Sequence, residues 1–153
     1  MTSLGSARIT EEPMERIGKL AIIDDAEFDQ MLYARIIART GLVDETLCFY
    51  SAEEAVEYFK SPDSEPVDVI LLDINMPGMS GFEFLELVSK DEFKEYADLV
   101  VVMLTTSLDP SDVARARSFD LVKDYINKPL EEQHIEQIIE MLRKIRNGEM
   151  TFK

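Results

Sequence analysis

The sequence is poor in cysteine and in basic residues, and it lacks a long apolar run. Its single cysteine, Cys48, excludes an internal disulfide framework and fits a reducing compartment. No apolar stretch approaches the roughly 20 residues that a membrane-spanning helix needs. Residues 1–15 also lack the apolar core of a secretory signal. We therefore expect a cytoplasmic protein that makes no use of a membrane.

The shortage of basic residues narrows the range of partners. The chain has 16 Lys and Arg residues against 31 Asp and Glu residues, which gives a formal net charge of −15. Nucleic acids and anionic membrane surfaces are both bound through basic surfaces. The charge balance therefore argues against both partners and favours proteins or cations.

The pattern of apolar residues predicts one α/β domain in the 153 residues. Apolar, strand-like runs alternate with segments of helical periodicity, without repeats or low-complexity stretches. The expected strands cover residues 19–23, 46–50, 67–72, 99–104 and 123–127, and the expected helices cover residues 27–40, 52–60, 82–90, 111–118 and 131–146. This alternation is typical of a doubly wound parallel sheet.

Local signals mark several of these elements. In the helix expected over residues 27–40, Phe28, Met31 and Ile36 recur at helical spacing, and Gly41 follows its end. Residues 67–72 are almost continuously apolar. Such a run indicates a strand that is buried on both faces, as in a parallel sheet.

Polar residues follow the ends of four predicted strands: Asp24 and Asp25, Asp73, Thr105, and Lys128. The carboxyl ends of parallel strands lie at one edge of the sheet, where ligands bind in this class of fold. We therefore expect three carboxylates, a hydroxyl and an ammonium group to converge. This set of groups suits a divalent cation and a phosphoryl group.

These groups predict a phosphoryl-transfer site. The Asp73 carboxylate can attack phosphorus to give an acyl phosphate. A free carboxylate repels an incoming phosphoanion, so the negative charge must be offset. A hard cation with oxygen ligands such as Asp25 and Asp73 would do so. Lys128 would pair with one phosphoryl oxygen and Thr105 would donate a hydrogen bond to another. Catalysis would then rest on positioning and charge neutralisation.

Each residue also has a purely structural interpretation. A helix cap would account for Asp24 and Asp25, the start of a turn would account for Asp73, and a solvated surface position would account for Lys128. Their joint placement at four strand ends favours the site.

Four motifs in order resemble the receiver domain of two-component response regulators. The resemblance covers residues 19–146, and its motifs are Ile22–Asp25, Leu72–Pro77 together with Gly81, Leu104–Thr106 and Tyr125–Leu130. It implies a receiver or flavodoxin-like (βα)5 fold, with a five-stranded parallel sheet in strand order 2-1-3-4-5 flanked by five helices. The sequence departs from the receiver pattern at residues 118–123 and at Thr106, where small residues are usual.

The resemblance also implies roles for individual residues. Asp73 would be the phosphoacceptor. Mg2+, or Mn2+ in its place, would be held by Asp25, Asp73 and the backbone carbonyl of Asn75, while Asp24 orders the waters of the metal. Pro77 and Gly81 would shape the loop after Asp73. By the same resemblance, the Lys128–Pro129 peptide bond would be cis and would aim the ammonium group into the site.

A receiver of this kind would switch on phosphorylation. Thr105 would move toward the phosphoryl group and Tyr125 would change rotamer with it. The surface formed by the helix at 111–118, the strand at 123–127 and the helix at 131–146 would then bind a target protein.

The resemblance leads us to expect a single-domain response regulator. Residues 1–17 would be a flexible leader, residues 18–147 the receiver, and residues 148–153 a short tail with no output domain after it. The phosphoryl donor would be a sensor histidine kinase or a histidine phosphotransfer protein, and the chain would be a monomer or a weak homodimer. A relay shuttle and a phosphate sink are alternatives to the switch.

Two other classes are less consistent with the sequence. A phosphatase of the haloacid-dehalogenase type also uses an Asp nucleophile, a Lys and Mg2+, but it needs a second acid two positions after the nucleophile. This chain has Asn75 there, so we expect no dedicated enzyme. A degenerate receiver that acts only as a binding module is at odds with the complete acidic set.

Overall fold

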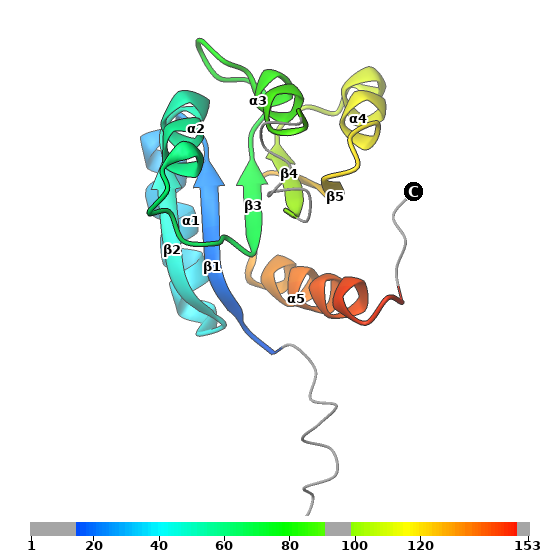
Figure 1. Ribbon diagram of the computed structural model, residues 1–153. Helices are drawn as coiled ribbons and strands as arrows, with labels where there is room; N and C mark the ends of the chain where they lie inside the picture. Colours follow the sequence, from blue (N-terminus) through cyan, green and yellow to red (C-terminus); the bar gives the residue numbers. More distant parts are fainter. Residues whose placement is uncertain (1–14, 91–98, 150–153) are drawn as a thin grey trace, which may run out of the picture.

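The computed structural model describes residues 15–90 and 99–149, in which strands and helices alternate along the chain (Figure 1). The elements are β1 (Ile17–Ile23), α1 (Glu27–Thr40), β2 (Val43–Phe49), α2 (Ala52–Lys60), β3 (Val69–Leu72), α3 (Gly81–Val88), β4 (Val101–Thr105), α4 (Pro110–Arg117), β5 (Val122–Asn127) and α5 (Glu132–Arg146). Every predicted helix and strand is therefore present, with shifts of up to three residues at the ends.

The five strands form one parallel sheet in the order β2-β1-β3-β4-β5, which confirms the predicted fold. The register pairs Ile23 of β1 with Leu72 of β3, and Leu72 in turn with Met103 of β4. The carboxyl ends of these three strands therefore reach the same edge of the sheet. Asp24 and Asp25 follow β1, Asp73 follows β3 and Thr105 is the last residue of β4, so predicted site residues from three strands lie at this edge.

Helices cover both faces of the sheet. α1 and α5 pack on one face, with Tyr33 and Ile135 in the same apolar cluster, and α2, α3 and α4 pack on the other. In Figure 1, α2, α3 and α4 are drawn above the sheet and α5 below it. All four residues of β3 are buried, as predicted for a strand covered on both sides.

The strands β1 and β2 begin two and three residues earlier than predicted. β2 begins at Val43 because it pairs along β1 from Ile17 onward, and Tyr50, expected in the strand, lies beyond its end and is exposed. Ile17 is fully buried in β1, although it was assigned to the leader. Residues 1–14 of the predicted leader and residues 150–153 of the predicted tail lie outside the described residues.

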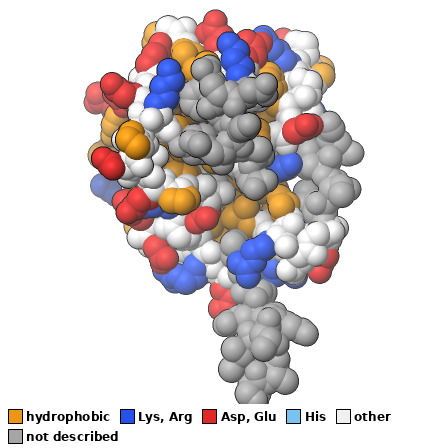
Figure 2. Space-filling model, in the orientation of Figure 1, with side chains coloured by type: hydrophobic (Ala, Val, Ile, Leu, Met, Phe, Trp, Pro, Cys, Tyr) orange, Lys and Arg blue, Asp and Glu red, His pale blue; other side chains and the backbone are white. Residues whose placement is uncertain are grey.

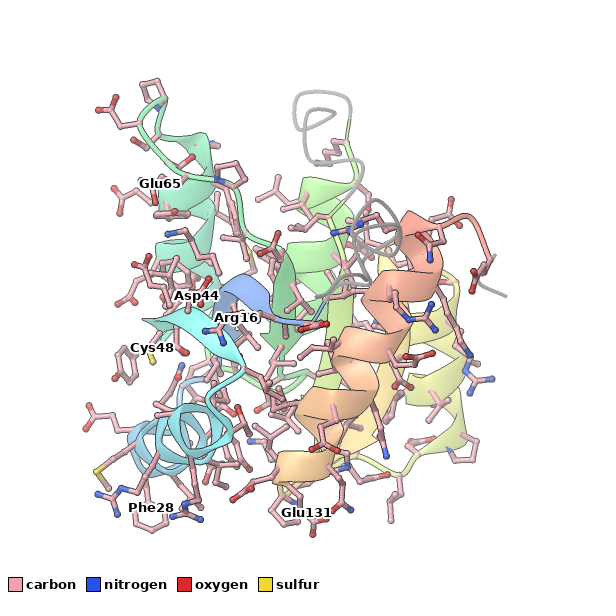
Figure 3. All side chains as sticks on the ribbon, turned by 90° about the horizontal axis from the view of Figure 1, so that it is seen from below. Arg16, Phe28, Asp44, Cys48, Glu65 and Glu131 are labelled. Carbon is pink, nitrogen blue, oxygen red and sulfur yellow. The ribbon has the colours of Figure 1, made fainter. Side chains whose placement is uncertain are left out.

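The buried face of α1 does not include Phe28 and Met31, two of the residues that recur at helical spacing. Gln30, Tyr33 and Ile37 face the interior, whereas Phe28 and Met31 are 68% and 53% exposed. Figure 3 shows the Phe28 side chain at the start of α1, pointing away from the rest of the molecule. Because this helix has apolar residues on more than one side, periodicity alone does not select the side that packs.

The surface agrees with the composition of the chain. On the face shown in Figure 2, acidic side chains are interspersed with basic ones around the molecule. In the described part of the chain, no helix is both long enough and apolar enough to span a membrane. Cys48 lies on the edge strand β2 as a half-buried free thiol (Figure 3).

Candidate functional site

Three carboxylates meet at the carboxyl edge of the sheet. Asp24 and Asp25 follow β1, Asp73 follows β3, and one oxygen from each lies within 4.8 Å of the others. Asp24 and Asp73 are buried, while Asp25 is exposed. Hard divalent cations such as Mg2+ prefer oxygen ligands of this kind, with some positions left to water. The donor set therefore fits a metal ion with one solvent-facing side.

The backbone fixes Asp24 firmly. Its N–H donates to the carbonyl of Phe49 at the end of β2 (3.1 Å), and its Oδ1 accepts from the N–H of Ala26 (2.9 Å). Ala26 is the N-cap residue of α1 and makes no side-chain cap bond. Asp24 thus helps to shape the turn into α1, while its second oxygen, Oδ2, reaches Lys128.

Gln30 ties the same region together and was missed by sequence reasoning. It is fully buried, and its Nε2 donates to the carbonyls of Phe49 (2.8 Å), Asp24 (3.1 Å) and Ile22 (3.2 Å). The side chain therefore joins α1 to the ends of β1 and β2. Gln30 lies three residues before Tyr33 and therefore on the same packed face of α1. This helical spacing was the sequence signal that could have indicated its burial.

Lys128 reaches the acidic group from the loop after β5. Its Nζ lies 2.7 Å from Oδ2 of Asp24, 2.9 Å from Oδ2 of Asp29 and 3.5 Å from Oδ2 of Asp73. Burial acts to lower the pKa of Lys128, but the hydrogen bonds to Asp24 and Asp29 outweigh it and raise the pKa. The side chain is therefore a fixed positive charge. The Lys128–Pro129 peptide bond is cis.

Asp73 is a carboxyl group with a raised pKa. Burial raises this pKa and the charge of Asp24 adds to the effect, whereas Lys128 and a hydrogen bond from Thr105 oppose it. Its Oδ1 accepts from the N–H of Ile74 (2.8 Å). The Asp73 charge is thus only partly compensated by protein groups.

Thr105 and Tyr125 are connected through Ser107. Thr105 is fully buried and its Oγ1 accepts from the N–H of Ser107 (3.3 Å). The Tyr125 hydroxyl donates to the carbonyl of Ser107 (3.0 Å). Thr106 is exposed, so of the two threonines it is Thr105 that lies beside Asp73. The pair expected to act as a switch thus shares one loop residue.

The loop after Asp73 closes back on its own start. The N–H of Gly81 donates to the carbonyl of Ile74 (2.8 Å), and the Ser80 hydroxyl caps α3 in a capping box with Glu83. Asn75 and Pro77 lie within this loop and are exposed. The loop therefore exposes Asn75 to solvent two residues after Asp73.

Sequence comparison agrees with this geometry. A family model described as the response regulator receiver domain matches residues 20–140. The chain belongs to the response regulator receiver family. Receivers are signalling domains of two-component systems, and in general they are not dedicated enzymes.

Individual relatives include both short and long proteins. A chemotaxis protein CheY homolog of Campylobacter jejuni is 30% identical over 132 residues, covering 86% of this chain and 96% of that protein. The hybrid signal transduction histidine kinase L of Dictyostelium discoideum is 26% identical over 139 residues, and the chain spans only 8% of its length. Receivers thus occur in proteins of very different size.

The fold also matches that of a solved response regulator. The crystal structure of a two-component response regulator from Cytophaga hutchinsonii is 29% identical, with a TM-score of 0.74 over 83% of this chain and 97% of that one. Its likeness to this chain extends over nearly the whole of both domains.

Proposed function

We propose that this receiver accepts a phosphoryl group on Asp73 from a sensor histidine kinase or a histidine phosphotransfer protein. The observation that carries the proposal is the convergence of three carboxylates within 4.8 Å, with the ammonium of Lys128 3.5 Å from Asp73. This arrangement offers a nucleophile and the means to offset its charge. The receiver would extend over residues 18–147 and act in the cytoplasm as a monomer or weak homodimer.

The chemical step is a displacement at phosphorus. One Asp73 oxygen forms a bond to phosphorus, the bond from phosphorus to the donor histidine nitrogen breaks, and its electron pair returns to the imidazole. Lys128 pairs with one phosphoryl oxygen and the Thr105 hydroxyl donates to another. Both side chains already lie beside Asp73, so little reorganisation is needed.

Asp24, Asp25 and Asp73, with the backbone carbonyl of Asn75, would hold Mg2+ or Mn2+. When bound, such a cation supplies the positive charge that lets a carboxylate and a phosphoanion approach one another. Asp73 remains the nucleophile, and Asp25 is the ligand that solvent reaches. The raised pKa of Asp73 indicates that its charge is under-compensated without such a cation.

Phosphorylation would be read on the surface formed by α4, β5 and α5. Attraction of the Thr105 hydroxyl to the phosphoryl group changes the loop that carries Ser107, and Ser107 holds the hydroxyl of Tyr125. Tyr125 lies on β5 and is half-buried. A target protein bound there would sense the change.

Intact-mass measurement after incubation with Mg2+ and acetyl phosphate tests the proposal. We expect the wild type to gain one phosphoryl group, with no gain in Asp73→Asn or when the metal is chelated. Asp63→Asn removes the same charge from an exposed loop residue and should react like the wild type. A wild type that gains no mass, or an Asp73→Asn variant that does, would contradict the proposal.

A further inference from the structure

A fourth carboxylate, Asp29, reaches the site from α1. The Lys128 ammonium donates to Oδ2 of Asp29 at 2.9 Å, across 99 positions of sequence. The Asp29 side chain is 31% exposed, so it closes the outer side of the lysine, whereas Asp24 closes the inner side and is almost fully buried. Lys128 is thus held between the sheet edge and the first turn of α1.

Asp29 differs from the other carboxylates around Lys128 in one respect. Asp24 and Asp73 belong to the group of three that could hold a cation, and among the described residues that group does not include Asp29. With a cation bound there, Asp24 and Asp73 would share their charge between the cation and Lys128. Asp29 can direct its charge to Lys128 alone.

The position of Asp29 is fixed by the contact between α1 and the segment after β5. Tyr33, one turn further along the same side of α1, is buried and bonded to the backbone of Leu130. Arg39, near the end of α1, pairs with Glu132 at the start of α5 (3.5 Å). Figure 3 shows the starts of the two helices, at Phe28 and Glu131, at the same end of the molecule.

We propose that Asp29 is a positioning residue that keeps Lys128 at the site once Asp24 and Asp73 are engaged with a divalent cation. This inference rests on the proposed function, because it assumes the metal site. A cation within the acidic group repels the nearby ammonium and weakens the hold of Asp24 and Asp73 on it. Asp29 then supplies the remaining attraction that keeps Lys128 from turning into solvent.

The geometry leaves room for the phosphoryl group without displacing Asp29. An ammonium has three N–H donors. Asp24 and Asp29 take two at 2.7 and 2.9 Å, whereas Asp73 lies at the longer distance of 3.5 Å. The third N–H of Lys128 therefore faces Asp73, where a phosphoryl oxygen would arrive. Asp29 orients Lys128 for this contact and does not compete for it.

The direct test follows the Lys128 ammonium by NMR in wild type and Asp29→Asn. We expect hydrogen exchange of this ammonium with water to be about fivefold faster in the variant, the effect of losing one partly exposed ion pair. Added Mg2+ should widen the difference. Glu27→Gln removes a charge from the same first turn at an exposed position and should leave the exchange unchanged. Equal exchange in wild type and Asp29→Asn overturns the inference.

The second measurement is the initial rate of phosphorylation by acetyl phosphate. Asp29→Asn should lower this rate by about two- to fivefold. The Mg2+ affinity of this variant, measured by calorimetry, and its melting temperature should both be close to those of Glu27→Gln. A faster rate would mean that Asp29 competes for Lys128 and would overturn the positioning role. If the wild type binds no Mg2+ and gains no phosphoryl group, the proposed function fails, while the exchange measurement in metal-free protein still decides the contact between Asp29 and Lys128.

Discussion

A β-carbon on Gly81 would lie only 2.2 Å from the main-chain carbonyl oxygen of Asp73. The first residue of α3 is therefore pressed directly against the backbone that carries the proposed phosphoacceptor. The requirement for glycine at this position is one of space, since the atom in the way belongs to the backbone and cannot rotate aside. The close contact between Gly81 and the Asp73 carbonyl therefore links the end of the loop to the position of Asp73.

Gly81→Ala should destabilise the domain and disturb the site together. We expect the free energy of unfolding to fall by about 1–3 kcal/mol because the added carbon forces the backbone apart. Urea denaturation measures the loss, and calorimetry should show weaker Mg2+ binding. Gly41→Ala is the matched control: its positive φ makes alanine unfavourable, but no atom lies within 4 Å of the new carbon. Gly41→Ala should lower the free energy of unfolding and leave Mg2+ affinity unchanged. Equal losses of Mg2+ affinity in Gly41→Ala and Gly81→Ala would contradict the argument.

Replacement of Gln30 should loosen the strand ends that carry Asp24. Gln30→Met keeps the length of the side chain but removes its hydrogen bonds to three backbone carbonyls. We expect a loss of about 2–4 kcal/mol in the free energy of unfolding, because buried carbonyls are left poorly satisfied. Met31→Ala on the exposed side of α1 should change stability by about 0.5 kcal/mol or less. Similar losses in the two variants would show that the Gln30 bonds carry little energy.

Asp73→Asn should stabilise the metal-free protein, and increasingly so as pH rises. The pKa of Asp73 is raised above its ordinary value of 3.8, so the folded state holds this proton more tightly than the unfolded state. The contribution of Asp73 to the free energy of unfolding is most favourable below pH 3.8 and is lost as pH rises through the raised pKa. We expect a melting temperature about 3 °C above the wild type at pH 7, which corresponds to about 1 kcal/mol for a domain of this size. The gap should narrow toward pH 4, and a gap independent of pH would contradict this account.

Mg2+ should raise the melting temperature of the wild type through its binding to the folded state alone. At a concentration of about 100 times the dissociation constant, the stabilisation is about 2.7 kcal/mol. Asp25→Asn removes the exposed ligand of the acidic group and should abolish most of the shift, whereas Asp63→Asn should keep it. Scanning calorimetry with and without Mg2+ makes the comparison. A full shift in Asp25→Asn would exclude Asp25 as a ligand.

The helix α1 shows where sequence periodicity stops being informative. Its existence and its end at Gly41 were predicted correctly, because both depend on neighbouring residues. Phe28 and Met31 recur at helical spacing but do not lie on the buried face, because apolar side chains occur on several sides of this helix. The connection from β1 and the contact with α5 select the buried side, and neither is visible in the sequence of the helix.

The alternation of strands and helices could be read from the sequence, and so could the acidic and basic residues at the strand ends. Both depend on periodicity and short motifs, which are local properties of the chain. The parallel sheet then brings Asp24, Asp25 and Asp73 to one edge. The folded structure was needed to show that Gln30 and Asp29 of α1 also reach this edge. Gln30 is bonded to the backbone of Asp24 and Asp29 to Lys128. Such contacts depend on how a helix is rotated and packed, which is set by the whole core and not by any segment of it.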